Sequence, residues 1–288
     1  MDTSELSANL SEALNTRLTV FELKPVHGGS INTCQVASTS EGNFFLKHNK
    51  ADFAADMFRK ETMGLNLLAS AKALRVPNVL GQVSLNKGAV LVLEHLPEKP
   101  SSKDFWQQLG AGIARLHKLK AKLHGLAYNN YFGSAIQYNT QTQNWTDFFI
   151  QQRLTPQLTD AKNKGRISGA EEARIVALIE KIPLLLYDEE PGLLHGDLWR
   201  GNIYASGEAC IVDPAVYFGH REVDLAMTTL FGGFDKQFYT AYQQEYPLEP
   251  DWQLRLPIYN LYPLLFHLNA FGREYWSRIA AILCKNSC

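Results

Sequence analysis

Residues 193–203, LLHGDLWRGNI, bring His195, Asp197 and Asn202 together in a short stretch that begins and ends with apolar side chains. The apolar ends predict two short strands, and Gly196 and Gly201 permit a tight turn between them. Connections held by rigid elements are where proteins often place reactive groups. We therefore expect this stretch to carry chemistry.

The spacing of these three residues is H-x-D-x-x-x-x-N, that of the catalytic loop of phosphoryl-transfer enzymes. Downstream, Asp213 ends the apolar run CIV, so its carboxylate is expected at the end of a strand. We predict that Asp197 accepts the proton of an acceptor hydroxyl, and that Asn202 and Asp213 supply oxygen ligands to Mg²⁺. His195 is predicted to be a buried residue that holds the loop, because Asp197 already serves as the proton acceptor.

The first hundred residues predict a small antiparallel sheet. Residues 18–38 contain two β-rich runs broken by Gly28 and Gly29, and a third run is FFLKHN at 44–49. Two more strands are predicted at 78–85 and 88–96. Helices are predicted over 5–16 and 51–72, and the second is expected to pack on the sheet.

These elements carry the remaining parts of a kinase-type nucleotide site. Lys47 lies in the third predicted strand and is expected to contact phosphates, while Glu61 in the following helix holds it by an ion pair. ATP and Mg²⁺ are the predicted ligands. The backbone of the glycine turn is expected near the phosphates and the strand leaving the sheet near adenine. The residues assigned to these two contacts are Gly28, Gly29, Ser30 and Asn32, and Glu94, His95 and Leu96.

The pattern changes after the segment LPEKPSS, at 96–102, which reads as a linker. Helices are predicted over 103–120, 144–158, 170–186, 221–230, 235–246 and 252–283. The fold class is therefore α+β, with a β-rich nucleotide-binding lobe at 1–97 and a helical catalytic and acceptor-binding lobe at 98–288.

Composition limits the partners. The chain has 288 residues, 28 basic and 29 acidic, and a net charge of -1, so no overall field favours nucleic acid or an anionic membrane. The amino terminus has no signal-peptide pattern and no apolar run is long enough for a membrane span, so a cytoplasmic protein is expected. The four cysteines show no metal-site spacing. We expect Cys34 to be an inert small residue rather than a redox-active one.

The longer strings resemble one family. GGSIN at 28–32, HGDLWRGN at 195–202 and DPAVYFGHREVDLAMTTLFGGF at 213–234 are similar to the fructosamine kinase, or ketosamine 3-kinase, family. This family belongs to the aminoglycoside phosphotransferase and choline kinase-like group, which has a protein-kinase-like fold. The resemblance implies ATP-dependent phosphorylation of the sugar 3-hydroxyl of a ketosamine, free or protein-linked. The phosphorylated adduct then breaks down and returns the free amine, so the process repairs glycation. Pro214 and the short glycine turn differ from the protein-kinase pattern.

Two alternative functions stay open at this stage: another small-molecule hydroxyl kinase of the same group, and a nucleotide-binding module without turnover. The acceptor site is also open. Trp199 could belong to the core or form a wall facing the sugar, and Asp224 could line the acceptor pocket or brace the loop. The residues predicted near the acceptor are Trp199, His220, Glu222 and Asp224. His117 is predicted to be a packing residue.

Overall fold

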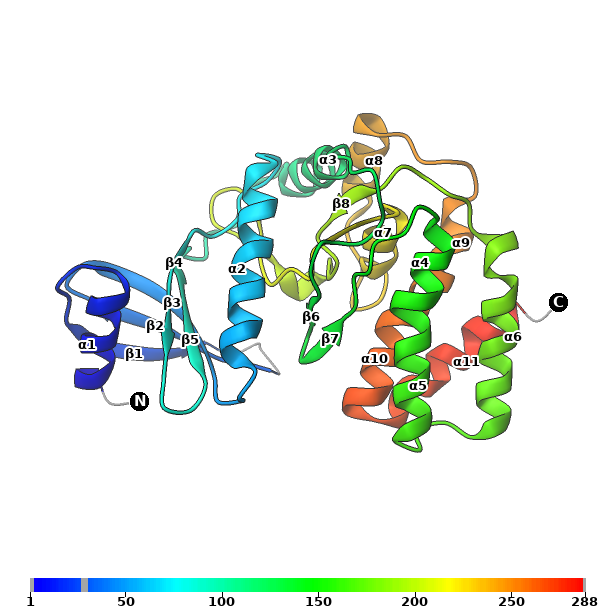
Figure 1. The fold of residues 1–288 in the computed structure, drawn as a ribbon. Helices are drawn as coiled ribbons and strands as arrows, with labels where there is room; N and C mark the ends of the chain where they lie inside the picture. The colour runs from blue at the N-terminus through cyan, green and yellow to red at the C-terminus, as the bar shows by residue number, and fades with distance from the viewer. Residues whose placement is uncertain (1–2, 27–30, 287–288) are drawn as a thin grey trace. The chain divides into compact units, whose positions relative to one another are not determined.

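The computed structural model describes residues 3–26 and 31–286 (Figure 1). The chain forms two compact units, Met1–Leu109 with Gly201–Pro214, and Gly110–Arg200 with Ala215–Cys288. The first unit thus reaches beyond the predicted boundary at residue 97 and takes in a segment from far along the chain. Backbone bonds explain this: Ile211 N–H donates to Arg75 O at 3.0 Å, and Lys99 N–H donates to Ala205 O at 3.0 Å. The functions assigned to the two lobes stay predictions.

The first unit is built on a five-stranded antiparallel sheet with strand order β1-β2-β3-β5-β4. In this order Lys47 of β3 is paired with Cys34 of β2 on one side and Leu91 of β5 on the other. A two-stranded ribbon completes the unit. The elements are α1 (Thr3–Ala13), β1 (Val20–Val26), β2 (Thr33–Thr39), β3 (Gly42–Asn49), α2 (Ala54–Ser70), β4 (Val79–Ser84), β5 (Ala89–Glu94), η2 (Arg200–Asn202, whose first residue is in the second unit), β9 (Ile203–Ala205) and β10 (Ala209–Ile211).

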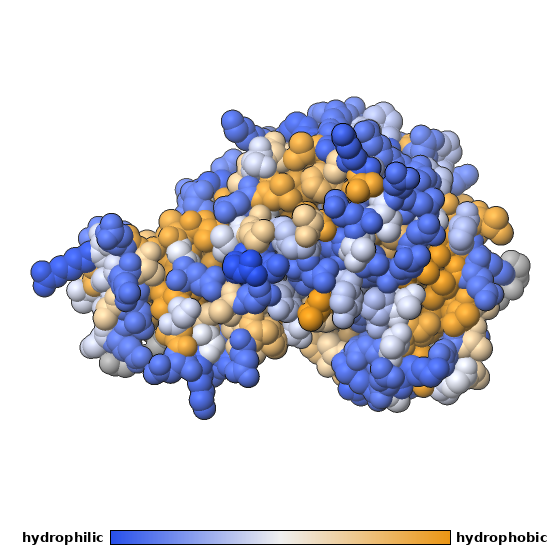
Figure 2. Space-filling view, viewed as in Figure 1, coloured by the Kyte–Doolittle hydropathy of each residue, from blue (hydrophilic) through white to orange (hydrophobic). Residues whose placement is uncertain are grey.

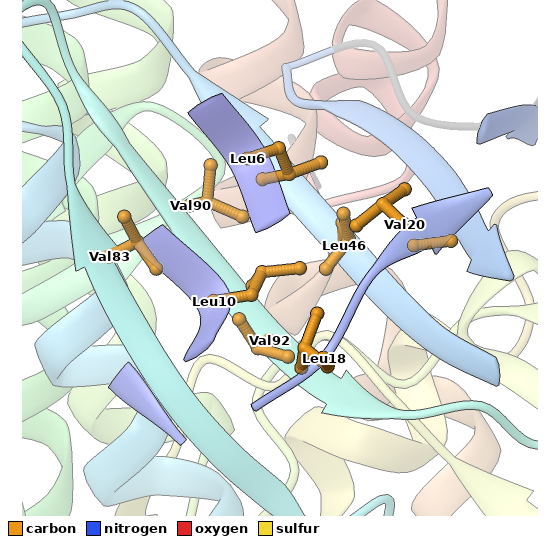
Figure 3. Close-up of a cluster of buried hydrophobic side chains, with 9 residues drawn as sticks. Leu6, Leu10, Leu18, Val20, Leu46, Val83, Val90 and Val92 are labelled. Atoms are coloured by element: carbon orange, nitrogen blue, oxygen red, sulfur yellow. The ribbon is translucent and has the colours of Figure 1, made fainter. Parts of the chain in front are cut away.

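Apolar side chains cover both faces of this sheet. On one face Leu6 and Leu10 of α1 pack against Leu46, Val90 and Val92 (Figure 3). Because side chains alternate along a strand, Lys47 points to the other face, where α2 lies. The sequence assigned one packed helix to the sheet, whereas α1 packs on it as well. Each buried leucine contributes about 1.5–3 kcal/mol.

The second unit is mostly helical, with two short antiparallel strand pairs, β8 with β11 and β6 with β7. The helix from 145 to 163 contains a π-helical segment, a feature often found at functional sites. The elements are α3 (Phe105–His117), which begins in the first unit, β6 (Asn130–Phe132), β7 (Ala135–Gln137), α4 (Trp145–Phe148), η1 (Phe149–Leu154), α5 (Thr155–Asn163), α6 (Gly169–Leu185), β8 (Gly192–Leu194), β11 (Tyr217–Gly219), α7 (Glu222–Met227), α8 (Lys236–Glu245), α9 (Trp252–Tyr259), α10 (Leu261–Phe271), η3 (Arg273–Tyr275) and α11 (Trp276–Lys285).

The predicted helices of this unit are present, but their bounds differ: the helix predicted over 144–158 continues to Asn163, and the one predicted over 221–230 ends at Met227. The single helix expected over 252–283 is divided into α9, α10, η3 and α11. Gly272, with φ of +119°, ends α10 in a conformation that a helix cannot continue. The hairpin β6–β7 and the strand β11 were not predicted, because runs of three residues are too short to show a period.

The surface is mixed in character. On the face shown in Figure 2, hydrophilic residues surround smaller apolar areas. Large apolar side chains that are exposed include Leu184 and Leu254, at 88% and 74% exposure. Among the described helices, none combines the length and the apolar character that crossing a membrane would require.

Candidate functional site

Lys47 is the centre of a buried charge cluster in the first unit. Its Nζ lies 2.5 Å from Oε1 of Glu61 and 2.9 Å from Oδ1 of Asp213. The lysine side chain is 4% exposed and the Glu61 side chain 10%, whereas Asp213 is 47% exposed. The fold therefore brings together a strand lysine, a helix glutamate and an aspartate that lies 166 residues further along the chain.

The charge on Lys47 is held by its partners. Burial alone would lower the pKa of the ammonium, but the carboxylates of Asp213 and Glu61 raise it above its ordinary value. Burial raises the pKa of Glu61, and the attraction of Lys47 opposes that shift. We take the lysine as charged at neutral pH, because two acceptors contact one donor.

Asp213 has an unusual backbone conformation. Its φ of +55° lies in the left-handed region, which a residue other than glycine seldom adopts. Such strain persists only where the surrounding structure imposes it, and it is concentrated at functional sites. Here it accompanies the contact between the carboxylate and Lys47.

Asn202 lies beside the same aspartate. Its Nδ2 donates to the main-chain oxygen of Asp213 at 3.4 Å, and its own main-chain oxygen accepts from Val212 N–H at 3.0 Å. A carboxylate oxygen and an amide oxygen are hard donors of the kind Mg²⁺ prefers. In the described part of the chain, no group of three or more His, Cys, Asp or Glu residues is arranged to hold a metal ion. The two residues fit a cation that takes its other ligands from phosphate and water.

The segment after β5 was predicted to contact adenine. Glu94 ends the strand, and its carboxylate binds the Arg75 guanidinium and accepts from both nitrogens of Asn78, at 3.1 and 2.9 Å. His95 and Leu96 follow outside the strand and are partly buried. Within residues 3–26 and 31–286, no hydrogen bond from the backbone of His95 or Leu96 is found. Those backbone groups are therefore available to a ligand.

The glycine turn is only partly described. Gly28, Gly29 and Ser30 lie outside the described residues. Asn32 is described, and its Oδ1 accepts from Asn49 Nδ2 at 2.9 Å, which ties the start of β2 to the end of β3. Burial raises the pKa of Cys34 to about 11, so the thiol is protonated at neutral pH. This favours the inert role expected for Cys34.

In the second unit, hydrogen bonds from its main-chain N–H groups hold the loop that carries Asp197. The carboxylate of Asp224 accepts from His195 N–H at 2.7 Å and from Gly196 N–H at 2.9 Å. Gly196 has φ of +82°, and a Cβ there would lie 2.0 Å from Ala215 O, so only glycine fits. His195 is fully buried and its Nδ1 accepts from Asp197 N–H at 3.2 Å, as expected of a residue that holds the loop.

The chain is similar to known proteins along almost its whole length. The family model described as fructosamine kinase matches residues 2–286. This chain belongs to the fructosamine kinase family. A probable ketoamine kinase from Synechocystis is 36% identical over 96% of this chain and 94% of its own length. A chloroplastic protein-ribulosamine 3-kinase from rice is 34% identical over 95% of this chain and 80% of its own length.

Solved structures agree with this family. A candidate fructosamine-3-kinase from Haemophilus somnus has a TM-score of 0.88 and 28% identity, covering 97% of this chain and 96% of its own. The aminoglycoside phosphotransferase APH(4)-Ia has a TM-score of 0.68 at 15% identity over 99% of both chains, which shows the fold alone. The fructosamine kinase family thus shares a kinase-like fold with that enzyme.

In this fructosamine kinase family member, three of the residues predicted near the acceptor are fully buried: His220, Glu222 and Asp224. Both carboxylate oxygens of Glu222 accept hydrogen bonds from the Arg255 guanidinium, from Nε at 2.9 Å and from Nη2 at 2.6 Å. The ring of His220 stacks on Tyr259, and burial lowers its pKa well below the ordinary value. These contacts favour a bracing role for all three residues over direct contact with a sugar.

Trp199 differs from them because it is only partly buried. Its indole meets the ring of Phe231 edge-on at 5.8 Å between centroids. Trp199 lies two residues after Asp197, and its main-chain N–H donates to the main-chain oxygen of Asp197 at 3.0 Å. Both predicted roles, packing and a wall facing the sugar, are compatible with this placement.

His117 has a larger role than the packing predicted from its place on an apolar helix face. Its Nε2 lies 3.1 Å from Asp224 Oδ2 and its Nδ1 2.8 Å from Tyr242 Oη, and the imidazole is fully buried. It therefore orients the carboxylate that holds the loop of Asp197. No pattern in the sequence links residues 117 and 224, so only the fold reveals this contact.

Proposed function

We propose that this protein is an ATP-dependent kinase that phosphorylates the 3-hydroxyl of a ketosamine. Membership of the fructosamine kinase family, with relatives named ketoamine kinase and ribulosamine 3-kinase, supports the substrate class. The observation that carries the chemistry is the contact of Lys47 with both Glu61 and Asp213. A fixed cation beside a half-exposed carboxylate is what binding of a metal-bound polyphosphate requires.

In the proposed reaction, the first unit binds the nucleotide. Lys47 contacts the phosphates, and the backbone groups of His95 and Leu96 accept the base. Asn202 and Asp213 would hold Mg²⁺, which when bound neutralises charge on the phosphates. The glycine turn, including Gly28, is proposed to cover the phosphates.

The second unit supplies the acceptor side. Asp197 accepts the proton of the sugar hydroxyl as its oxygen forms the new bond to the γ-phosphorus, and ADP leaves with the electrons of the broken P–O bond. His195 and Asp224 hold the backbone of that loop, so the carboxylate need not be reoriented during the reaction. Loss of the phosphorylated sugar then returns the amine, which makes the proposed process a repair of glycation.

The test is turnover on a panel of acceptors. The protein is incubated with Mg-ATP and ribulosamines, fructosamines, choline or aminoglycosides, and the phosphorylated carbon is assigned by NMR. We expect turnover of a ketosamine with phosphate on O3. Turnover of choline or an aminoglycoside alone would assign another function.

Two variants connect the activity to the site. Asp197→Ala is expected to lower kcat by about 10³-fold or more while leaving nucleotide affinity within about twofold, because the base contacts the acceptor. Asp160→Ala, a surface aspartate of α5 paired with Lys164, is the matched control and should keep full activity. Normal turnover by Asp197→Ala would contradict the proposed base.

A further inference from the structure

A buried chain of polar side chains in the second unit has no part in the proposed reaction. It begins on the hairpin β6–β7, which Figure 1 labels, where the paired residues Asn130 and Gln137 are 4% and 1% exposed. On the opposite face of the hairpin, Ile136 is 50% exposed. Two buried amides on one side of a short hairpin are costly unless every polar atom has a partner.

The two amides hold successive carbonyl groups of one segment. Gln137 Nε2 donates to Ala215 O at 3.0 Å and to Asn130 Oδ1 at 2.9 Å. Asn130 Nδ2 donates to Val216 O at 2.8 Å. Tyr262 Oη donates to Gln137 Oε1 at 3.1 Å, which fixes the orientation of the amide. The hairpin therefore grips residues 215 and 216 through their main chain.

The far end of the chain is an arginine in the π-helical segment. Arg153 is fully buried, and its Nη2 donates to Asn139 Oδ1 at 2.7 Å. Asn139 Nδ2 in turn donates to Asn130 Oδ1 at 2.8 Å. The guanidinium lies 4.0 Å from the centroid of the Tyr217 ring, and its Nη1 donates to the carbonyl oxygens of Tyr138 and Gln152. Aromatic faces and carbonyl groups thus stabilise this charge.

The gripped segment is in direct contact with the loop of the proposed base. Ala215 N–H donates to His195 O at 2.9 Å. The carbonyl oxygen of Ala215, the same atom that accepts from Gln137, lies 2.0 Å from where a Cβ on Gly196 would be. Because the backbones are this close, a displacement of Ala215 must move Gly196, the residue before Asp197.

We propose that Gln137 is a positioning residue for Asp197, acting through the carbonyl group of Ala215. The Asp224 carboxylate holds the Asp197 loop by accepting from the main-chain N–H groups of His195 and Gly196. Gln137 holds the main chain of Ala215, which packs against Gly196 of the same loop. Asn130, Asn139 and Arg153 keep the Gln137 amide in place. The kinetic part of this inference rests on the proposed kinase function, and the positioning part does not.

The chain offers a matched control in Gln157. This glutamine of α5 is 7% exposed, and its Oε1 accepts from Asn269 Nδ2 at 3.0 Å. It is therefore a buried glutamine in an amide network of the same unit. This contact joins α5 to α10, two elements that contain neither residues 195–197 nor residues 215–216.

The experiment compares Gln137→Met with Gln157→Met, since methionine keeps the length of the side chain without its donor. Hydrogen exchange is followed in peptides covering 193–199. We expect Gln137→Met to speed exchange of the His195 and Gly196 amides at least tenfold, and Gln157→Met to leave it unchanged. With a ketosamine acceptor, kcat should fall 10- to 100-fold in Gln137→Met only, with KM for ATP within twofold.

Equal exchange rates in the two variants would overturn the proposal. If the wild type showed no kinase activity, the proposed function would fail while the exchange data still decided the positioning role. Should Gln137→Met not fold, Tyr262→Phe removes one bond to the Gln137 amide and is expected to speed exchange two- to fivefold. Unchanged exchange in that variant would then overturn the proposal.

Discussion

Single residues of the site have contacts that their neighbours in sequence do not explain. Lys47 contacts two carboxylates, Glu61 and Asp213, and the first of these is nearly buried. A buried charge that loses its partner destabilises the fold more than removal of the whole pair does. The cluster therefore serves the fold as well as the proposed nucleotide site.

Replacing Lys47 with methionine should expose this double role. We expect Lys47→Met to lower the free energy of unfolding by about 3 kcal/mol, because Glu61 is left buried without its cation. The double variant Lys47→Met/Glu61→Gln should recover much of the stability but not the affinity for ADP. Urea denaturation measures the first effect and calorimetric titration the second. A single variant as stable as the wild type would contradict the ion pair.

Gly196 offers a separate test of the Asp197 loop. Gly196→Ala combines a left-handed φ with a contact of 2.0 Å, so we expect a loss of more than about 2 kcal/mol of stability. Gly207→Ala is the control, since Gly207 has a φ of +84° but its Cβ would meet nothing closer than Lys99 Cδ at 3.7 Å. Urea denaturation of both variants separates the contact from the backbone strain. Equal losses would mean that the close approach to Ala215 is not as found.

At the level of elements, helix ends and short strands decide how the second unit is divided. Ser168 begins α6 with a capping box, in which its Oγ accepts from Glu171 N–H at 3.3 Å and the Glu171 carboxylate accepts from Ser168 N–H at 2.8 Å. The hairpin β6–β7 is held by its amides rather than by strand length. Its apolar pattern alone is too short to form a stable pair in water.

The cap of α6 can be measured directly. Ser168→Ala should lower the free energy of unfolding by about 1 kcal/mol, because the Glu171 N–H at the helix start loses the Oγ that accepts from it. Ser70→Ala, at the exposed end of α2, is the control and should change stability by less than about 0.5 kcal/mol. The unfolding midpoint in urea is the measurement. A Ser168→Ala protein as stable as Ser70→Ala would show that the cap contributes nothing.

Over the whole molecule, several histidines are wholly or partly buried as neutral rings. Burial lowers the pKa of His124, His220 and His267 below the ordinary value. Arg221 and Arg255 add to this effect at His220, and Asp188 opposes it at His124. In the unfolded chain these rings titrate near pH 6.5, so below that pH the unfolded state binds protons that the folded state does not.

Stability is therefore expected to be full above about pH 6.5 and to decrease as the pH is lowered. Between pH 6.5 and 5.5, a ring that stays neutral in the fold contributes a loss of about 1 kcal/mol. Urea unfolding at these two pH values measures the total, and His220→Phe should reduce the loss while keeping an aromatic ring in place. A free energy of unfolding that rises on acidification would contradict neutral burial.

The fold class and the family were both correctly predicted from sequence, whereas the division of the long C-terminal helix and the hairpin at 130–137 were not. Periods of 2 and 3.6 residues are visible only over longer runs. The buried amides Asn130 and Gln137 look like ordinary loop residues in the sequence, since nothing there indicates their burial.

The sequence by itself determined the order of the motifs, the membership of the fructosamine kinase family and the faces of the main strands and helices, because these depend on residue type and local spacing. Only the tertiary structure decided that Lys47 meets Asp213, that Asp224 and His117 hold the loop of Asp197, and that Gln137 reaches Ala215. These contacts join residues far apart in the chain, and they depend on which side chains the packed core brings within hydrogen-bond distance.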